Sequence, residues 1–429
     1  MESIKHSKTL GVPAADAKHS GLGSLATKSD LSASKNSSDE LPSPVDLKKS
    51  ISRKKSTAPK ECIPEVQGPE DLNRLLGSTL NAILDENKGS NVIASPLSLY
   101  SCFAMIGQGL GGGKTFKELQ KVFGFTENTI LSDSLLKSIL KVTEAEGVTV
   151  KMVSHLYTNK NVKIKSDFVE ELKTKYHAIA KSLDFSKPET VDEINQQISE
   201  STEGLVRGAL NQLSPTAFSV MVNSIYFKGE WEYPFSEDTN FQHPFKKSDG
   251  TQVESTFMAH RNNLASIKIG KGCSNYLALS YVGGDLKLVI EMTKDKVLGP
   301  HDPDEVMQVA AQTPSMCEVY IPKFKSVFSC DLLPVLKKLG IHRIFSASKE
   351  FSKITDHQMC IGSIVHNACI QVDERGTEAF CFTMAEEFGE GSSGTALPKF
   401  VADRPFYFHL VDIRNKIILF SGTLEEPRF

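Results

Sequence analysis

The chain has 429 residues, 40% of them hydrophobic and 24% charged, which is enough apolar material for a full core. Its net charge of -3 argues against a general nucleic-acid binder. No apolar run reaches the roughly 18 residues that a membrane-spanning helix needs, so we expect neither nucleic acid nor membrane as a partner.

Residues 1–67 differ in composition from the rest of the chain. The first sixty residues contain 13 serines, 11 Lys or Arg and 6 Asp or Glu, and the first aromatic residue of the chain is Tyr100. Such a segment cannot bury enough apolar surface to offset the entropy lost on ordering. We therefore predict a disordered Ser/Lys-rich extension over 1–67 and one folded domain over 68–429.

The start of the chain also bears on its location. It lacks the apolar run of about 7–15 residues that marks a secretory signal. The eight cysteines form no Cys-x-x-Cys pair, which favours scattered reduced thiols. Basic residues at Lys48-Lys49 and Arg53–Lys55 resemble a nuclear localisation signal. We expect a cytoplasmic protein, with a nuclear pool or release by a signal-independent route as alternatives.

Helical periodicity begins directly after the extension. Apolar residues recur at helical spacing over 69–84, and Ser95-Pro96 supplies a cap and a first-turn proline for a second helix. Further helical patterns lie at 115–123, 131–145, 164–179 and 189–203.

Strand patterns dominate the later part of the chain, at Val148–Thr158, Phe218–Phe227 and Ile364–Val372. Two hairpins are also predicted, over 277–292 with a turn at Gly283-Gly284 and over 406–422 with a turn at Arg414-Asn415. Helices early and strands late indicate an α+β fold rather than a repeated βαβ unit.

Two stretches resemble ligand-binding motifs. Gly107–Thr115 is similar to a phosphate loop, but Gln108 occupies the first required glycine position and a helix precedes it, which favours a turn between helices. His301–Glu305 offers metal-binding atoms without a second histidine, so we expect a solvated turn. No spacing of serine, histidine and acid selects a catalytic triad. We therefore expect no catalytic residue, no metal and no cofactor.

The stretch between Gly376 and Pro405 is unusual, because it contains a run rich in Gly, Ser and Glu that ends at Thr395 and its second half is loop-like. A loop of that length in a compact domain is usually functional. Its first half alternates larger residues with small ones, which would give an extended strand one narrow face able to enter a packed sheet. The small residues are Thr377, Ala379, Cys381 and Thr383.

Motifs spread over 69–429 resemble those of the serpins, the serine protease inhibitor family, and occur in the family's order. They are Asn91–Ser98, Asn223–Trp231, Asp373–Ala379, Phe400–Phe406 and Ile418–Gly422. The resemblance implies that 68–429 is a serpin domain, a metastable fold of three β-sheets and eight to nine helices with an exposed reactive-centre loop.

The resemblance also implies an activity. A target serine or cysteine protease would attack the loop as a substrate and form an acyl-enzyme. The cleaved loop would then insert into the main sheet and trap the protease. The chain would be a monomeric protease inhibitor and not an enzyme. The alternative is a non-inhibitory chaperone, carrier or storage serpin, favoured by Phe380 and Phe382 where inhibitory members mostly have alanine.

Roles for individual residues follow from the same resemblance. The hinge of the loop would comprise Glu374, Gly376, Thr377, Glu378 and Ala379. Trp231 would lie at the top of the sheet opening, above a hydrogen-bonded cluster that is structural rather than catalytic. The residues of that cluster would be Ser95, Ser98, Asn223 and His366.

The cleaved bond follows from counting. Inhibitory members are cut fourteen residues after the hinge glycine, which here gives Glu390–Gly391. Phe388 is the alternative cut residue and would suit an apolar protease pocket, whereas Glu390 would suit a basic one. Lys114, Lys117 and Lys121 could share one helix face and contact a sulfated polysaccharide weakly, although a solvated amphipathic face explains them equally.

Overall fold

The computed structural model describes residues 69–125, 148–201, 204, 207–208, 210–270, 274–293, 302–377 and 396–429. The predicted N-terminal extension, the helical pattern at 131–145 and residues 378–395 lie outside these ranges.

The predicted helices that fall within the described ranges are confirmed. Ser95 caps the second of them, because its Oγ accepts a hydrogen bond from Ser98 N at 3.1 Å and Pro96 follows as the first helical residue. The α-helices of the described residues are α1 (Pro69–Glu86), α2 (Pro96–Gly109), α3 (Gly113–Phe123), α5 (Ser166–Tyr176), α6 (Glu189–Ser201), α7 (Pro303–Ala310) and α8 (Leu333–Lys338).

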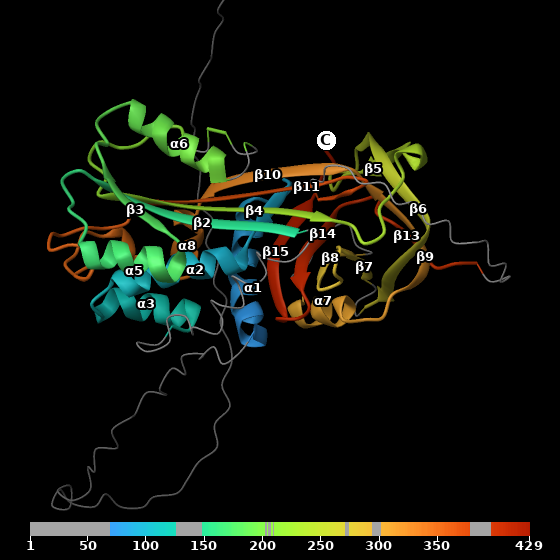
Figure 1. The fold of residues 1–429 in the computed structure, drawn as a ribbon, viewed down its shortest axis with the longest axis horizontal. Helices are drawn as coiled ribbons and strands as arrows, with labels where there is room; N and C mark the ends of the chain where they lie inside the picture. The colour runs from blue at the N-terminus through green and yellow to red at the C-terminus, as the bar shows by residue number, and fades with distance from the viewer. Residues whose placement is uncertain are drawn as a thin grey trace, which may run out of the picture. The chain divides into compact units, whose positions relative to one another are not determined.

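A six-stranded sheet lies between two layers of helices (Figure 1). The apolar side chains of α6 pack on one face of this sheet, and those of α2 and α5 pack on the other. Its strands, in spatial order, are β10 (Phe324–Asp331), β11 (Ser363–Val372), β12 (Gly376–Thr377), β4 (Ser219–Glu230), β2 (Val148–Asn159) and β3 (Ile179–Leu183).

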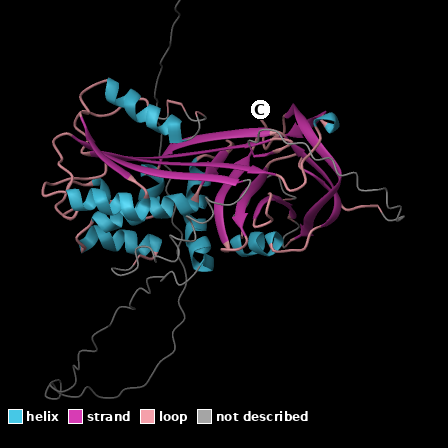
Figure 2. Ribbon diagram, in the orientation of Figure 1, coloured by secondary structure: helices cyan, strands magenta, loops and turns pink. Residues whose placement is uncertain are grey.

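The remaining strands form two sheets that share the long strand β6 (Gln252–Ile269) (Figure 2). One part of β6 pairs with β5 (Phe241–Lys246) and β9 (Ser315–Pro322), and its last residues pair with β7 (Asn275–Ser280). Three sheets with helices packed on them confirm the α+β fold class and agree with the number of sheets that the resemblance implied. The other strands are β1 (Val92–Ala94), β8 (Leu286–Met292), β13 (Lys399–Val401), β14 (Phe406–Asp412) and β15 (Ile417–Leu424).

Both predicted hairpins are present. Strands β7 and β8 are joined through Gly283 and Gly284, whose φ angles of 87° and 73° need glycine-like freedom. Strands β14 and β15 turn where Asn415 N donates to Asp412 Oδ1 at 2.9 Å. The hairpin prediction therefore holds at both places.

The interpretation of His301–Glu305 as a solvated turn was wrong. Asp302 caps α7, since its Oδ1 accepts from Asp304 N at 3.0 Å and Glu305 N at 3.4 Å, and Pro303 is the first helical residue. Glu305 is buried and meets Tyr276 Oη at 3.4 Å through its Oε2. The acidic residues therefore start a helix.

The glycine-rich stretch is a turn between helices, as predicted, running from the end of α2 at Gly109 to the start of α3 at Gly113. The Glu350 carboxylate accepts hydrogen bonds from Thr115 N at 2.8 Å and Lys114 N at 3.3 Å. A helix N-terminus attracts anions, and here the protein's own carboxylate occupies that position.

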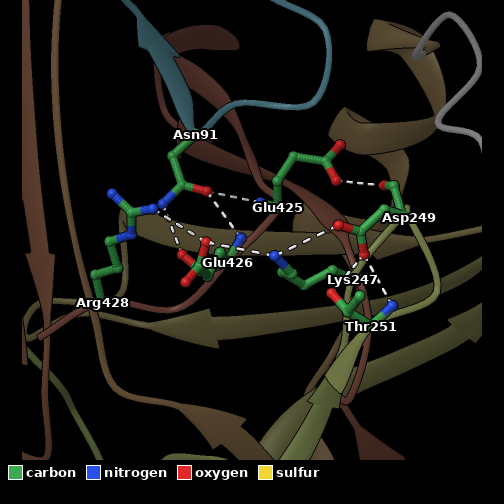
Figure 3. A network of polar contacts seen from close by, with 8 residues as sticks. Asn91, Lys247, Asp249, Thr251, Glu425, Glu426 and Arg428 are labelled. Carbon is green, nitrogen blue, oxygen red and sulfur yellow. Dashed lines mark hydrogen bonds and ion pairs between the residues drawn. The ribbon is translucent and has the colours of Figure 1, made fainter. Parts of the chain in front are cut away.

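The C-terminal residues are tied to distant parts of the chain (Figure 3). The Asn91 side chain accepts from Glu425 N at 2.8 Å and Glu426 N at 3.0 Å, and donates to Glu426 O at 2.7 Å. Lys325 N donates to Arg428 O at 2.6 Å, so the last residues run beside the edge strand β10. The backbone of the chain end is thus fixed by the Asn91 side chain and by the backbone of β10.

Two further expectations can be compared with the described ranges. Within them, no helix combines the length and the apolar character that a membrane crossing requires. Five cysteines fall in these ranges, and all five are free thiols, as predicted. They are Cys102, Cys317, Cys330, Cys360 and Cys369.

Candidate functional site

The contact between β11 and β4 has a closed end and an open end. At the closed end, residues 363–369 of β11 pair directly and in parallel with residues 220–226 of β4. At the open end, β12 lies between the two strands and is antiparallel to both, with Thr377 opposite Val372 on one side and Gly229 on the other. The sheet therefore already holds the first two residues of the segment that the sequence singled out.

A tight turn brings β12 into the sheet. Asp373 N donates to Gly376 O at 2.9 Å, and Arg375 N donates to the Asp373 carboxylate at 3.1 Å. Gly376 has a φ of 153°, and a Cβ at this position would lie 2.1 Å from Gly229 O. Because only glycine allows this approach of two backbones, the residue at 376 decides whether the strand can enter here.

Glu374 fixes the base of the hinge through a largely buried ion pair. Its Oε1 lies 2.9 Å from Lys323 Nζ, with side-chain exposures of 6% and 17%, and also accepts from Asn240 Nδ2. Burial raises the pKa of Glu374, but the hydrogen bonds from Lys323 and Asn240 outweigh burial and leave the pKa below its usual value. The carboxylate is therefore ionised and held.

Trp231 and Tyr281 cover the hinge from within the molecule. The indole Nε1 donates to Asp373 O at 2.9 Å, and the indole ring stacks on Tyr281 with centroids 4.5 Å apart. The Tyr281 hydroxyl lies 2.8 Å from Thr377 Oγ1, and both residues are 0% exposed. Burial raises the pKa of the Tyr281 phenol, so it is neutral at physiological pH. We call Trp231, Asn240, Tyr281, Lys323 and Glu374 the hinge anchor.

At the closed end, Asn223 is the hub of a second group of side chains. Its Oδ1 accepts from Ser98 Oγ and from His366 Nδ1, each at 2.8 Å, and its Nδ2 donates to Ser154 Oγ at 2.9 Å. Ser95 N donates to His366 Nε2 at 3.3 Å, which places the ring proton on Nδ1. We call these five residues the polar cluster.

The polar cluster is neutral as well as buried. Burial lowers the pKa of His366 to about 3, so the imidazole carries no charge at neutral pH. The hydrogen bonds given above satisfy each of its polar groups with another member of the cluster, as buried polar groups require. This arrangement holds strands together and presents no nucleophile to solvent.

The structure thus places the sequence-predicted residues in two groups. Glu374, Gly376 and Thr377 lie at the open end, where Trp231 donates to the carbonyl of the adjacent Asp373, whereas the four predicted cluster residues meet at the closed end. The predicted residues Glu378, Ala379, Phe388, Glu390 and Gly391 lie outside the described residues.

The three lysines singled out for a polyanion all lie on α3. Their side chains are exposed, while Thr115, Phe116 and Leu119 form the buried face of the same helix. Lys114, Lys117 and Lys121 therefore form the basic, solvent-exposed face of an amphipathic helix. This arrangement fits both the polysaccharide contact and the solvated face that the sequence suggested.

Sequence reasoning missed Ser154, Asn240, Tyr281 and Lys323. Each contacts its partner through side chains that the fold brings together from distant parts of the chain; Tyr281 and Thr377, for example, are 96 positions apart. The one local signal was the position of Tyr281, a large aromatic residue just before the Gly283-Gly284 turn of a predicted hairpin.

Comparisons with known proteins agree with this geometry. A family model described as Serpin (serine protease inhibitor) matches residues 71–427. Human serpin B9 is 30% identical over 368 residues, spanning 81% of this chain and 96% of that protein. Rabbit heparin cofactor 2 is 27% identical over 366 residues, spanning 82% of this chain and 75% of that protein.

Solved structures share the fold. Human thyroxine-binding globulin, determined in complex with thyroxine, superimposes with a TM-score of 0.74 at 21% identity, and the match covers 84% of this chain and 99% of that chain.

Proposed function

Because the chain belongs to the serpin family, we propose that it inhibits an endopeptidase as a suicide substrate. The hydroxyl or thiol of the protease attacks the carbonyl of Glu390, and an ester or thioester forms as the Glu390–Gly391 peptide bond breaks. The amine of Gly391 leaves with a proton. The freed loop then enters the six-stranded sheet before water can release the protease.

The position of β12 carries this proposal. An inserting strand must lie between β11 and β4 and run antiparallel to both, and Gly376–Thr377 already does so. The side chain of Thr377 points into the core, where it meets Tyr281. This supports a loop that enters the sheet from its hinge end, with the small-residue face inward.

The register of β12 supports the same model when it is continued along the strand. It would place Ala379 between Phe227 and Ile370, and Thr383 between Asn223 and His366. A threonine would thus arrive at the polar cluster, where its hydroxyl could find a partner. The inserted strand would replace the direct pairing of β11 with β4 by two new ladders, which would stabilise the cleaved form.

The same register bears on the two phenylalanines that favoured the alternative function. Phe380 would fall between Tyr226 and Cys369, which belong to the apolar cluster under α6. An aromatic side chain on this face would therefore meet apolar side chains as well as solvent. The alternative, a non-inhibitory carrier, chaperone or storage serpin, is favoured by Phe382, whose neighbours in that register would be Ser224 and Asn367.

A weak polyanion contact is a second part of the proposal. The exposed lysines of α3 form a basic face, and one similar protein, heparin cofactor 2, is named for heparin. We also propose a cytoplasmic location with a nuclear pool, and a monomeric protein whose macromolecular partner is the target protease.

The experiment that tests inhibition is incubation with proteases that cut after acidic or aromatic residues, followed by a denaturing gel. We expect a protease–protein adduct that survives detergent, and a cleaved form with a higher unfolding temperature. Thr377→Arg should abolish the adduct and preserve cleavage, because it places a charge at a buried position.

Ser329→Arg is the matched control, since it adds the same charge at an exposed position of the same sheet. Cleavage without adduct by every protease, together with no thermal stabilisation, would favour the non-inhibitory alternative. Mass spectrometry of the C-terminal fragment distinguishes Gly391 from Gly389 as its first residue, and hence Glu390 from Phe388 as the cut residue.

A further inference from the structure

The Tyr281 side chain occupies a position between the hinge and the core. Its ring stacks on Trp231 and meets the edge of Phe227, with centroids 4.5 Å and 5.0 Å away. Its hydroxyl reaches past these rings to Thr377 Oγ1 at 2.8 Å. The ring therefore belongs to the permanent core, whereas the hydroxyl contacts a residue of the hinge.

The hydrogen bond between Tyr281 and Thr377 exists only while β12 is seated. Both groups are fully buried, and within the described ranges each is the hydrogen-bond partner of the other's hydroxyl. Burying a hydroxyl without a hydrogen-bond partner is unfavourable. The seated arrangement is therefore stabilised only when both hydroxyls are present and bonded to each other. Withdrawal of β12 would break the bond and open the cavity that Thr377 fills.

We propose that Tyr281 is a positioning residue that latches the hinge at Thr377 and so sets the balance between the seated and the withdrawn loop. This inference deepens the proposed function, because seating of Thr377 would be the first step of loop insertion. It assigns a requirement to two positions at once, a phenol at 281 and a hydroxyl at 377.

The chain contains its own reporter of the seated state. Trp231 is the only tryptophan, is 3% exposed, and is bonded through its Nε1 to the hinge carbonyl of Asp373. If β12 withdraws, the indole loses part of its cover. Quenching of its fluorescence by acrylamide therefore measures hinge seating in the intact protein, with no protease present.

The test is a double-mutant cycle of Tyr281→Phe and Thr377→Val on the full chain. Each single variant keeps the shape of the side chain and leaves one buried hydroxyl without its partner, so we expect the seated-to-withdrawn ratio to fall roughly tenfold and acrylamide quenching to rise about twofold. The double variant removes both hydroxyls and should return quenching close to the wild-type value.

Tyr276→Phe is the matched control. It also removes a buried phenol hydroxyl, which is bonded to Glu291 at 2.9 Å, from strand β7 just before Tyr281. We expect it to leave Trp231 quenching unchanged. The proposal is overturned if acrylamide quenching of Trp231 in the single variants equals that of the wild type. It is also overturned if quenching in the double variant is no closer to the wild-type value than in the single variants.

A second readout separates this inference from the proposed function. With a protease that forms an adduct with the wild-type protein, Tyr281→Phe should increase the molecules consumed per protease trapped about threefold, because slower seating gives hydrolysis more time. If the wild-type protein forms no adduct, inhibition fails as a proposal. The fluorescence cycle still decides the latch on its own.

Discussion

The closed and open ends of the β11–β4 contact are held by different chemistry. At the closed end, neutral side chains around Asn223 satisfy one another by hydrogen bonds. At the open end, the ionised pair of Glu374 and Lys323 and the stacked rings of Trp231 and Tyr281 hold the turn that leads into β12. The neutral hydrogen bonds of the closed end can be exchanged for others, whereas the ion pair and the stacked rings fix the open end.

For the loop insertion proposed above, the difference indicates which part of the site would move. A buried ion pair is strongly unfavourable to break on one side, so the base of the hinge should stay in place during insertion. Neutral hydrogen bonds can be remade with an arriving hydroxyl at little net loss. The closed end is therefore suited to the separation of β11 from β4, and the open end is suited to holding an inserting strand in position.

Loss of the hub should have the largest effect. Asn223→Ala leaves Ser98, Ser154 and His366 without a buried partner, and we expect the free energy of unfolding to fall by about 4 kcal/mol. Denaturant titration measures this change. A loss below about 1 kcal/mol would show that the closed end does not depend on its polar cluster.

Loss of the ion pair at the open end should have the second-largest effect on stability. Lys323→Met leaves the buried Glu374 carboxylate without its ionic partner, and we expect a loss of about 3 kcal/mol and greater quenching of Trp231. Adding Glu374→Gln should recover much of the loss, because no unpaired charge is then buried. If the double variant is less stable than the single one, charge pairing is not what holds the hinge base.

As the pH falls, the closed end and the open end should begin to lose stability at different pH values. The pKa of His366 is lowered to about 3 from about 6.5 in the unfolded chain, so the unfolded state binds the proton first. Stability is therefore complete above pH 6.5 and falls between 6.5 and 3, by about 2 kcal/mol at pH 5 for this residue. His155, with a pKa lowered to about 4 by burial, adds a loss of the same sign.

His366→Gln should flatten the stability profile between pH 6.5 and 3, the range over which this histidine lowers stability, and should leave the contribution of Glu374 in place. The Glu374 carboxylate, whose pKa is lowered, contributes stability that is complete above its unfolded value and is lost only as the pH falls through its folded pKa. Equal slopes for wild type and variant between pH 5 and 7 would contradict the neutral, buried histidine.

The smallest effect should come from the exposed ion pair beside the hinge. Glu237 lies 3.3 Å from Arg375, with side-chain exposures of 67% and 44%. Solvent screens such pairs, so Glu237→Gln should change the free energy of unfolding by less than about 0.5 kcal/mol. A loss comparable to that of Lys323→Met would show that exposed charges also fix the hinge.

Long periodic segments were the easiest parts of the fold to predict from the sequence. The leucine-rich spacing of 69–84 and the two glycine- or asparagine-containing turns depend on local chemistry alone. Helix α7 escaped prediction because it is short, and because Asp302-Pro303 suits both a turn and a helix start. In the structure, Asp302 caps the helix and Pro303 begins it.

The site was predicted less completely than the fold. The cluster and hinge residues came from motif resemblance, and the structure brings them together in two groups. Lys323 and Tyr281 were missed because their side chains reach Glu374 and Thr377 only in the folded chain, which leaves no local pattern. The sequence predicted that a strand starting near Thr377 could enter the sheet, but it did not predict that Gly376 and Thr377 are already paired with β4 and β11.

The chain end described above has a consequence for a molecule cut in residues 378–395. The piece after the cut would include β14, which lies between β8 and β15, and residues 425–426, which Asn91 holds. Such a piece would be an inner part of the sheet and not a displaced peptide. A severed molecule should persist as two complementary chains that migrate together until a denaturant separates them.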